Sequence, residues 1–307
     1  MAWSQDGKQL VVTDVSAHRL LRYSLEGRLL GAVEKPAFVQ SEFKPTQVHA
    51  TSNGFVVRNS AYDWIWFDRD LKPLRQVGSS LPKFDLIHEA LIGDDQLAGY
   101  GAFRKGDGSW GMGVLQVRLS PSLALDKVVE EIPYDSNGGN LTSFYVFVAA
   151  SAAGDSYFLR FDDPSYILDV KRGRHLKAFP PGFEHLPKLP KNTGEDSTSP
   201  RARAVETSTL PVALYGRGAF LYLLTRQAQP QGKTLWRLYR IDPKKDAVIG
   251  SFTIPSSAAN LNLAPGPDSW AVLEESSLIP SGDLRPQGLI LVSATAVDQG
   301  GTISSCN

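Results

Sequence analysis

The stretch that decides the fold is residues 11–23, VVTDVSAHRLLRY, together with a second copy at residues 55–67, FVVRNSAYDWIWF. The two copies align without a gap at an offset of 44 residues, and the match continues as far as Val33 on Val77. Each copy places Ser-Ala between two apolar segments, which indicates two strands joined by a loop. A period near 44 residues is typical of a four-stranded blade in a circular repeat fold.

Four weaker copies follow, with the same order of strand, Gly or Asp turn, strand, polar loop and hairpin. Six copies in the chain give about 51 residues each, which suits blades with longer loops. Helical periodicity is scarce, and Phe84–Ile92 fits a helix or a strand equally well. We therefore predict an all-β fold, a six-bladed β-propeller with four-stranded antiparallel blades, as a single domain over 1–307. The expected blades are approximately 1–40, 41–83, 84–136, 137–190, 198–257 and 258–307.

Composition excludes several classes of protein. A hydrophobic fraction of 42% is ample for a packed core. The 32 basic residues equal the 32 acidic ones, so no excess positive charge favours nucleic acid, and RNA binding is the least favoured interpretation. The lone Cys306 forms neither an internal disulfide nor a thiolate-rich zinc site. No apolar run reaches 18 residues, so no transmembrane helix is expected.

The first copy resembles the NHL-type repeat of six-bladed propellers. It has a glycine turn at Gly7, a strand that ends in Asp14, a loop that closes in His18-Arg19 and an acidic-Gly turn at Glu26-Gly27. The second copy keeps the frame but carries Arg58 in place of Asp14, and Tyr62-Asp63 in place of His18-Arg19. The resemblance implies a six-bladed propeller, and it implies no single activity because this fold carries many.

Both ends of the chain bear on ring closure and on compartment. The start has no basic and apolar signal-peptide pattern. Because the chain begins almost inside a strand, we expect an exported or periplasmic protein whose signal peptide is absent from this sequence, and otherwise a cytoplasmic one. We expect the C-terminal segment near Thr302–Cys306 to supply the outer strand of the sixth blade, since an open ring exposes strand edges.

Loop lengths indicate which face of the propeller binds. With strands A to D in each blade, the A–B and C–D turns are short. The B–C loops (Gly101–Trp110, Arg226–Lys233) and the D–A crossings (Glu34–Lys44, Pro180–Ala204) are long and open on the opposite face. Binding groups gather on long loops of a rigid scaffold. The candidate ligand-binding residues on this long-loop face are Asp14, His18, Arg58, Tyr62, Arg104, Trp110, Asp162, Asp163, Arg226 and Glu274.

Each candidate has a structural alternative. Asp14, His18 and Arg19 can tie their own loop together by hydrogen bonds and ion pairs. The five histidines are scattered without a zinc-binding spacing, so no cofactor or metal is predicted from the sequence. Lactonases of similar six-bladed architecture hold Ca²⁺ or Zn²⁺ at the channel mouth, and Asp162-Asp163 and Glu274-Glu275 are the acidic pairs to inspect.

Two functions remain open. The first is a non-enzymatic binding or scaffold propeller that engages a protein, peptide or glycan through the long-loop face. The alternative is a metal-assisted lactonase- or lyase-like hydrolase with its site at the central channel mouth. No Gly-x-Ser-x-Gly motif and no phosphate-binding loop occurs in the sequence.

Overall fold

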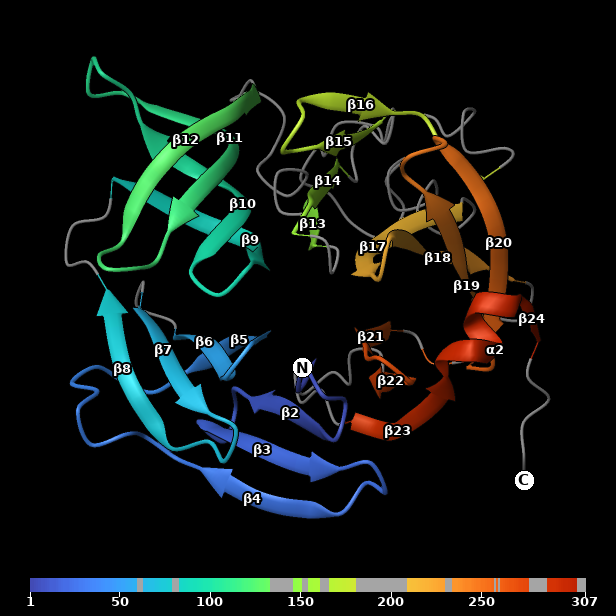
Figure 1. Ribbon diagram of the computed structural model, residues 1–307, viewed down its shortest axis with the longest axis horizontal. Helices are drawn as coiled ribbons and strands as arrows, with labels where there is room; N and C mark the ends of the chain where they lie inside the picture. The colour runs from blue at the N-terminus through green and yellow to red at the C-terminus, as the bar shows by residue number, and fades with distance from the viewer. Residues whose placement is uncertain are drawn as a thin grey trace, which may run out of the picture.

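Six sheets stand in a ring around a central channel, and the N-terminus lies near the centre of the ring (Figure 1). The computed structural model describes residues 1–59, 63–78, 83–132, 146–150, 154–160, 166–180, 209–229, 234–256, 258, 260–275 and 286–302. Within these residues, four sheets carry four antiparallel strands in sequential order, and one sheet carries three. The remaining sheet carries four antiparallel strands and a fifth strand that is parallel to the fourth. The predictions of an all-β fold and of a six-bladed propeller are confirmed.

The strands of the first three blades follow one another along the chain. Blade one holds β1 (Ala2–Trp3), β2 (Gln9–Asp14), β3 (Arg19–Ser24) and β4 (Leu29–Val33). Blade two holds β5 (Pro45–Thr51), β6 (Gly54–Asn59), β7 (Asp63–Asp68) and β8 (Pro73–Gly78). Blade three holds β9 (Phe84–Ile92), β10 (Gln96–Arg104), β11 (Trp110–Arg118) and β12 (Ala124–Ile132).

The last three blades differ more in size. Blade four holds β13 (Val146–Ala150), β14 (Ser156–Arg160), β15 (Ile167–Asp169) and β16 (Arg174–Leu176). Blade five holds β17 (Thr209–Arg217), β18 (Phe220–Ala228), β19 (Thr234–Asp242) and β20 (Ala247–Ile254). Blade six holds β21 (Asn260–Pro265), β22 (Ser269–Glu275) and β23 (Pro286–Ser293), followed by α2 (Ala294–Gln299) and β24 (Gly301–Thr302).

The inner strands are apolar on both faces because a neighbouring blade covers each face. In β6, Phe55 and Val57 pack in one cluster with Val11 and Leu20 of blade one. Val56, which points to the opposite face of the same strand, packs with residues of blade three. This explains why the copy at residues 55–67 lacks the polar alternation of a half-exposed strand.

In blade three, the structure resolves one assignment that the sequence left open between helix and strand, and it shortens one expected loop. Phe84–Ile92 is a strand, and β10 continues through Gly101 to Arg104, so the B–C loop is shorter than expected. Gly101 lies at a β-bulge, where a Cβ atom would fall 1.9 Å from the Asp85 carbonyl oxygen. The glycine therefore serves a close approach of two strands and does not mark a loop.

The innermost strands close the ring. Each first strand contacts the first strands of the neighbouring blades, including β1 against β21. At this last seam the Trp3 indole Nε1–H donates to the Ala264 carbonyl oxygen at 3.1 Å, and the ring packs against Gly266. Trp3, Leu10, Ala264 and Ala271 form one buried cluster that joins blade one to blade six.

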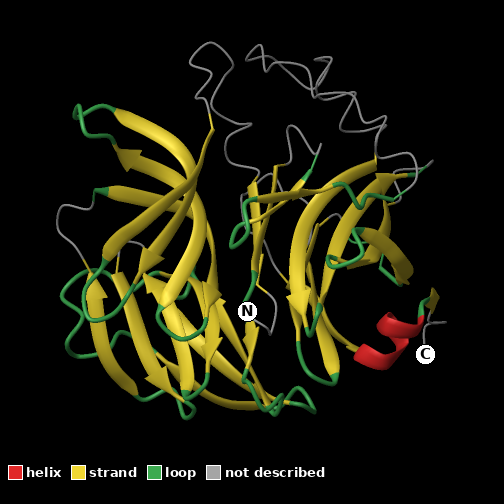
Figure 2. Ribbon diagram, turned by 45° about the horizontal axis from the view of Figure 1, so that its top comes forward, coloured by secondary structure: helices red, strands yellow, loops and turns green. Residues whose placement is uncertain are grey.

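The expected placement of the C-terminus is wrong. β24 pairs in parallel with β20 and so extends blade five, not blade six; residues 303–306 of the expected strand lie outside the described residues. Between β23 and β24 the chain forms α2, at the periphery of the ring (Figure 2). Ala294 and Val297 of α2 are buried in the core shared by blades five and six, and this burial draws the chain toward blade five.

Asp298 of α2 anchors the helix to blade five. Its carboxylate accepts hydrogen bonds from Arg217, at 2.7 Å, and from the Tyr222 hydroxyl, while its carbonyl oxygen accepts one from Arg240 at 2.9 Å. Burial raises the pKa of Asp298, but the bonds from Tyr222 and Arg217 outweigh it and hold the pKa below its ordinary value. Burial and Asp298 raise the pKa of Tyr222 to about 12.

Replacement of Trp3 tests ring closure. We expect Trp3→Ala to lower the free energy of unfolding by about 3–5 kcal/mol, because a large buried side chain leaves a cavity at the seam. Trp3→Phe keeps most of the apolar area but orphans the Ala264 carbonyl, at a cost of about 1 kcal/mol. Urea denaturation measures both, with Trp110→Ala, an exposed tryptophan, as the matched control. Equal stability of all three variants would contradict closure through this seam.

Replacement of Asp298 tests the anchor of α2. At pH 7 we expect Asp298→Ala to cost about 1–3 kcal/mol, because buried donors lose their acceptor. The folded-state pKa lies below the ordinary 3.8, so this contribution is present above that value and is lost as pH falls through the lowered pKa. Denaturation at pH 7 and at acidic pH should therefore show a difference from wild type that shrinks in acid. Glu34→Ala, at an exposed carboxylate, should show no such difference, and a gap that widens in acid would overturn the prediction.

Candidate functional site

A cavity of about 830 Å³ occupies the central channel. Residues from the first strands of blades one, two, three, five and six line it, together with the A–B turns that follow β1, β17 and β21. The cavity size is within the range of small-molecule sites. Polar groups enter it from several blades, among them Gln47, His49, His88, Asn262 and Arg217.

Glu89 places a buried carboxylate in the channel wall between blades two and three. Its side chain has no exposed surface, and its Oε2 atom lies 2.8 Å from an Arg58 guanidinium nitrogen. The Gln47 amide, oriented with its nitrogen toward the carboxylate, donates to Oε1 at 2.6 Å. A buried charge requires such compensation, because desolvation of an unpaired carboxylate is costly.

Arg58 is tied into the same seam. Besides Glu89, it donates to the Leu86 carbonyl oxygen, lies 3.7 Å from Asp85 and stands over the ring of Trp64. Arg58 was predicted to lie on the ligand-binding face. In the structure its guanidinium points instead toward blade three, where it contacts Glu89 and Leu86. Arg58 and Glu89 therefore join two blades across the sheet surfaces.

His49 lies next to this pair and faces the cavity. Its Nε2 atom is buried, is 3.9 Å from Glu89 Oε1 and has no hydrogen-bond partner among the described residues. His88, the neighbour of Glu89 in β9, also lines the cavity. None of Gln47, His49 and Glu89 was among the candidate residues predicted from the sequence. Their shared position in first strands is the signal that could have grouped them.

The described residues show no cluster that would hold a metal. No three His, Cys, Asp or Glu side chains meet in such an arrangement in this part of the chain. Asp162 and Asp163, one of the acidic pairs considered, lie outside the described residues. Glu274 is half-buried in β22, opposite Leu261 and Gly288.

On the long-loop face, blade one uses its polar residues locally. Asp14 accepts a hydrogen bond from the Ala17 amide at 3.0 Å and pairs with Arg19 at 3.0 Å. His18 lies 3.3 Å from Glu42 of the crossing to blade two. These contacts match the structural alternative, in which the loop is tied together. Tyr62 lies outside the described residues.

The structure brings two of the predicted residues together on blade three. Arg104 ends β10 and Trp110 begins β11, and the two lie directly opposite each other in the strand register. Directly paired residues point to the same face of a sheet. Trp110 is 57% exposed, the most exposed of the tryptophans in the described residues, and Arg104 is exposed beside it. A cation and an indole therefore share one accessible surface.

Arg226 and Glu274 occupy facing sheet surfaces of blades five and six. Arg226 is paired with Trp236, and Glu274 with Leu261, and both apolar partners belong to the core between these two blades. The Nε atom of Arg226 is buried and has no hydrogen-bond partner in the described residues. This seam brings opposite charges to the same interface without a direct ion pair.

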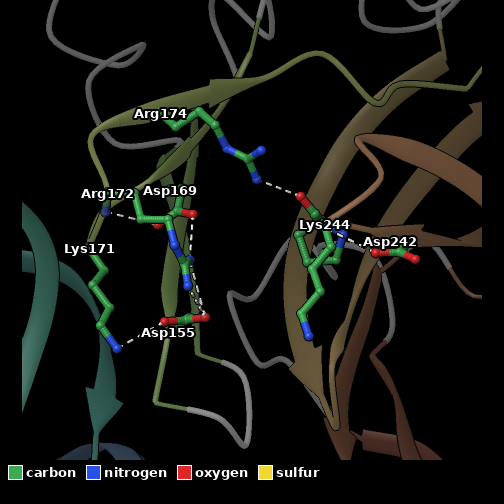
Figure 3. A network of polar contacts seen from close by, with 8 residues as sticks. Asp155, Asp169, Lys171, Arg172, Arg174, Asp242 and Lys244 are labelled. Carbon is green, nitrogen blue, oxygen red and sulfur yellow. Dashed lines mark hydrogen bonds and ion pairs between the residues drawn. The ribbon is translucent and has the colours of Figure 1, made fainter.

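The short-turn face is braced between blades. In blade four, Arg172 bridges Asp155 and Asp169, and Arg174 reaches the Pro243 carbonyl oxygen of blade five at 2.6 Å (Figure 3). Asp169 is fully buried, so Arg172 compensates a charge that water does not reach. Arg217 makes the corresponding link from blade five to the Pro267 carbonyl oxygen of blade six.

Comparison with known proteins does not assign this chain to a family. No family model matches the chain, and none of the curated proteins matches it. Solved structures that align with it include Hsv2 of Kluyveromyces lactis, at 9% identity over 94% of this chain and 97% of that one, with a TM-score of 0.41. BamB of Moraxella catarrhalis aligns at 10% identity over 96% and 76%, with a TM-score of 0.36. Dihydro-heme d1 dehydrogenase NirN aligns at 12% identity over 95% and 57%, with a TM-score of 0.38.

In the described part of the chain, no helix is long and apolar enough to cross a bilayer.

A double-mutant cycle tests whether Glu89 and Arg58 stabilise the fold as a pair. We expect Glu89→Leu alone to cost about 3–5 kcal/mol, because Arg58 loses its buried carboxylate partner and keeps only the more distant and more exposed Asp85. The double variant Arg58→Met with Glu89→Leu should recover most of that loss. Guanidinium denaturation of the four proteins gives the coupling energy. Additive effects would mean that the two side chains do not form a structural pair.

Proposed function

We propose that this protein is a non-enzymatic binding propeller that engages a protein, peptide or glycan through its long-loop face. The observation that carries the proposal is the exposed pair of Arg104 and Trp110 on blade three. Trp and Arg are the side chains most enriched where binding energy is concentrated. Trp110 is 57% exposed, so more than half of its surface is available to a ligand.

The hairpin that carries the pair is internally braced. The Lys105 amide donates to the Ser109 carbonyl at 2.8 Å, and the Ser109 amide and hydroxyl both donate to Asp107. The Ser109 hydroxyl holds the pKa of Asp107 below its ordinary value, so this carboxylate is charged at neutral pH. Lys105 also pairs with Glu131 of β12. A braced loop loses little conformational entropy on binding.

The length of blade three supports an accessible site. Its four strands have nine residues each, whereas those of blade four have five or three. Trp110 lies on the same face as Met112, which packs toward blade four. The guanidinium and the indole favour a ligand with an anionic group beside an apolar or sugar-ring surface.

Substitution of Trp110 tests the proposal. The wild-type protein is screened against a glycan array and a displayed library of random peptides, and each hit is then measured with Trp110→Ala and Arg104→Ala. We expect both variants to lose binding at least about tenfold, as removal of a hot-spot residue does. The control is Leu74→Ala, an equally exposed apolar residue on β8. Hits that bind all the variants equally would overturn the proposal.

A second candidate function rests on the channel. The cavity and the His49 Nε2 atom, which has no hydrogen-bond partner in the described residues, are the observations behind the hydrolase alternative. Its metal, Ca²⁺ or Zn²⁺, would need ligands beyond those that the described residues bring together. Elemental analysis of protein purified without added metal tests it. One divalent ion per chain, lost in His49→Ala, supports the enzyme. The absence of metal together with no thermal shift on adding Ca²⁺ or Zn²⁺ contradicts it.

A further inference from the structure

Blade six differs from the other five blades at its outer edge. Each of the others places a fourth strand outside its third, whereas blade six ends at β23 in the described residues. The chain leaves β23 directly into α2 and then joins the sheet of blade five. The outer edge of β23 therefore presents unpaired backbone groups in this part of the chain, and such an edge is a template for a further strand.

The third strand of blade six also exposes two apolar side chains in its middle. Leu289 and Leu291 are 36% and 40% exposed. In the third strands of blades two and three, apolar residues such as Ile65 and Leu115 have no exposed surface. Ile65 and Leu115 pack in buried clusters that they share with a neighbouring blade, whereas Leu289 and Leu291 belong to none of the buried clusters of the described residues.

The two leucines point toward blade one. Leu291 is paired with Ala271, which belongs to the cluster that joins blades six and one. On the other wall, Leu10 of that cluster is paired with Tyr23, and Tyr23 is paired with Leu29. Leu29 is 53% exposed. Leu29, Leu289 and Leu291 thus place exposed apolar side chains on the two blade surfaces that face each other at the seam between blades six and one, and we call these three residues the leucine strip.

We propose that the outer edge of β23, with the leucine strip beside it, binds an extended segment of a partner polypeptide as the fourth strand of blade six. The segment pairs antiparallel with β23, as each described fourth strand pairs with its third, and it carries apolar side chains at alternate positions. Main-chain hydrogen bonds to the edge of β23 supply affinity, and the leucine strip selects the apolar side chains. The site is separate from the long-loop face and does not depend on the function proposed for it.

The probe is a synthetic peptide with the sequence of β20, residues 247–254, extended by two lysines for solubility. In this fold that sequence already pairs antiparallel with a third strand. Fluorescence anisotropy measures its binding to the whole chain. Hydrogen exchange of β23 is followed with and without the peptide. We expect binding together with new protection of the β23 amides, and no binding by the same peptide N-methylated at alternate residues.

Variants locate the peptide. Leu291→Lys should weaken binding at least about tenfold, as loss of a buried leucine contact does. Leu74→Lys, at an exposed apolar residue of a fourth strand in blade two, should leave binding unchanged. Three outcomes would overturn the proposal: β23 amides already protected in the free monomer, a dimer that the peptide fails to dissociate, or equal binding by Leu291→Lys. The N-methylated peptide keeps the test decisive if Leu291→Lys fails to fold.

Discussion

Face-to-face packing of neighbouring sheets is the constraint on which this structure depends. A single four-stranded sheet cannot bury its own apolar faces, so each blade needs a neighbour on both sides, and the need ends only when the last blade meets the first. The seam of Trp3, Leu10, Ala264 and Ala271 is where this condition is met. The same requirement explains why inner strands are apolar on both faces.

The two ends of the ring solve different problems. At the short-turn end, third strands finish in an oxygen-bearing side chain, as at Ser24, Asp68, Asp169 and Asp242, which accepts backbone amides of the turn that follows. These Asx-type turns keep the connections short. Arginines then link one blade to the next, for example Arg22 to Asp70. The opposite end carries the longer connections. The exposed Arg104 and Trp110 lie there, and in the described residues neither forms such a link between blades.

Sequence patterns predicted what is local and repeated. The offset of 44 residues revealed the blade because turn chemistry and strand alternation recur within each copy. The C-terminal strand was misplaced because α2 has only six residues, no side-chain N-cap and no charged residue in its terminal turns that would favour a helix. The helix is held instead by Arg217 and Tyr222, which lie about 80 residues upstream in sequence.

The candidate site shows the same division between local and distant information. Arg104 and Trp110 were both predicted as candidates because both lie in the segment Gly101–Trp110, which was expected to be a long loop. Their position opposite each other follows from the register of β10 and β11. The pairing of Arg58 with Glu89 depends on the angle between two blades, which no spacing encodes.

This division bears on how binding and stability are coupled. Residues in the channel and the seams, such as Glu89 and Arg58, hold blades together, so their substitution changes the ring before it changes any ligand contact. The Arg104–Trp110 surface lies at the tip of a hairpin whose own hydrogen bonds hold its shape. Substitutions at the hairpin tips of such a ring should therefore cost little stability. Substitutions of channel residues that join two blades should cost more.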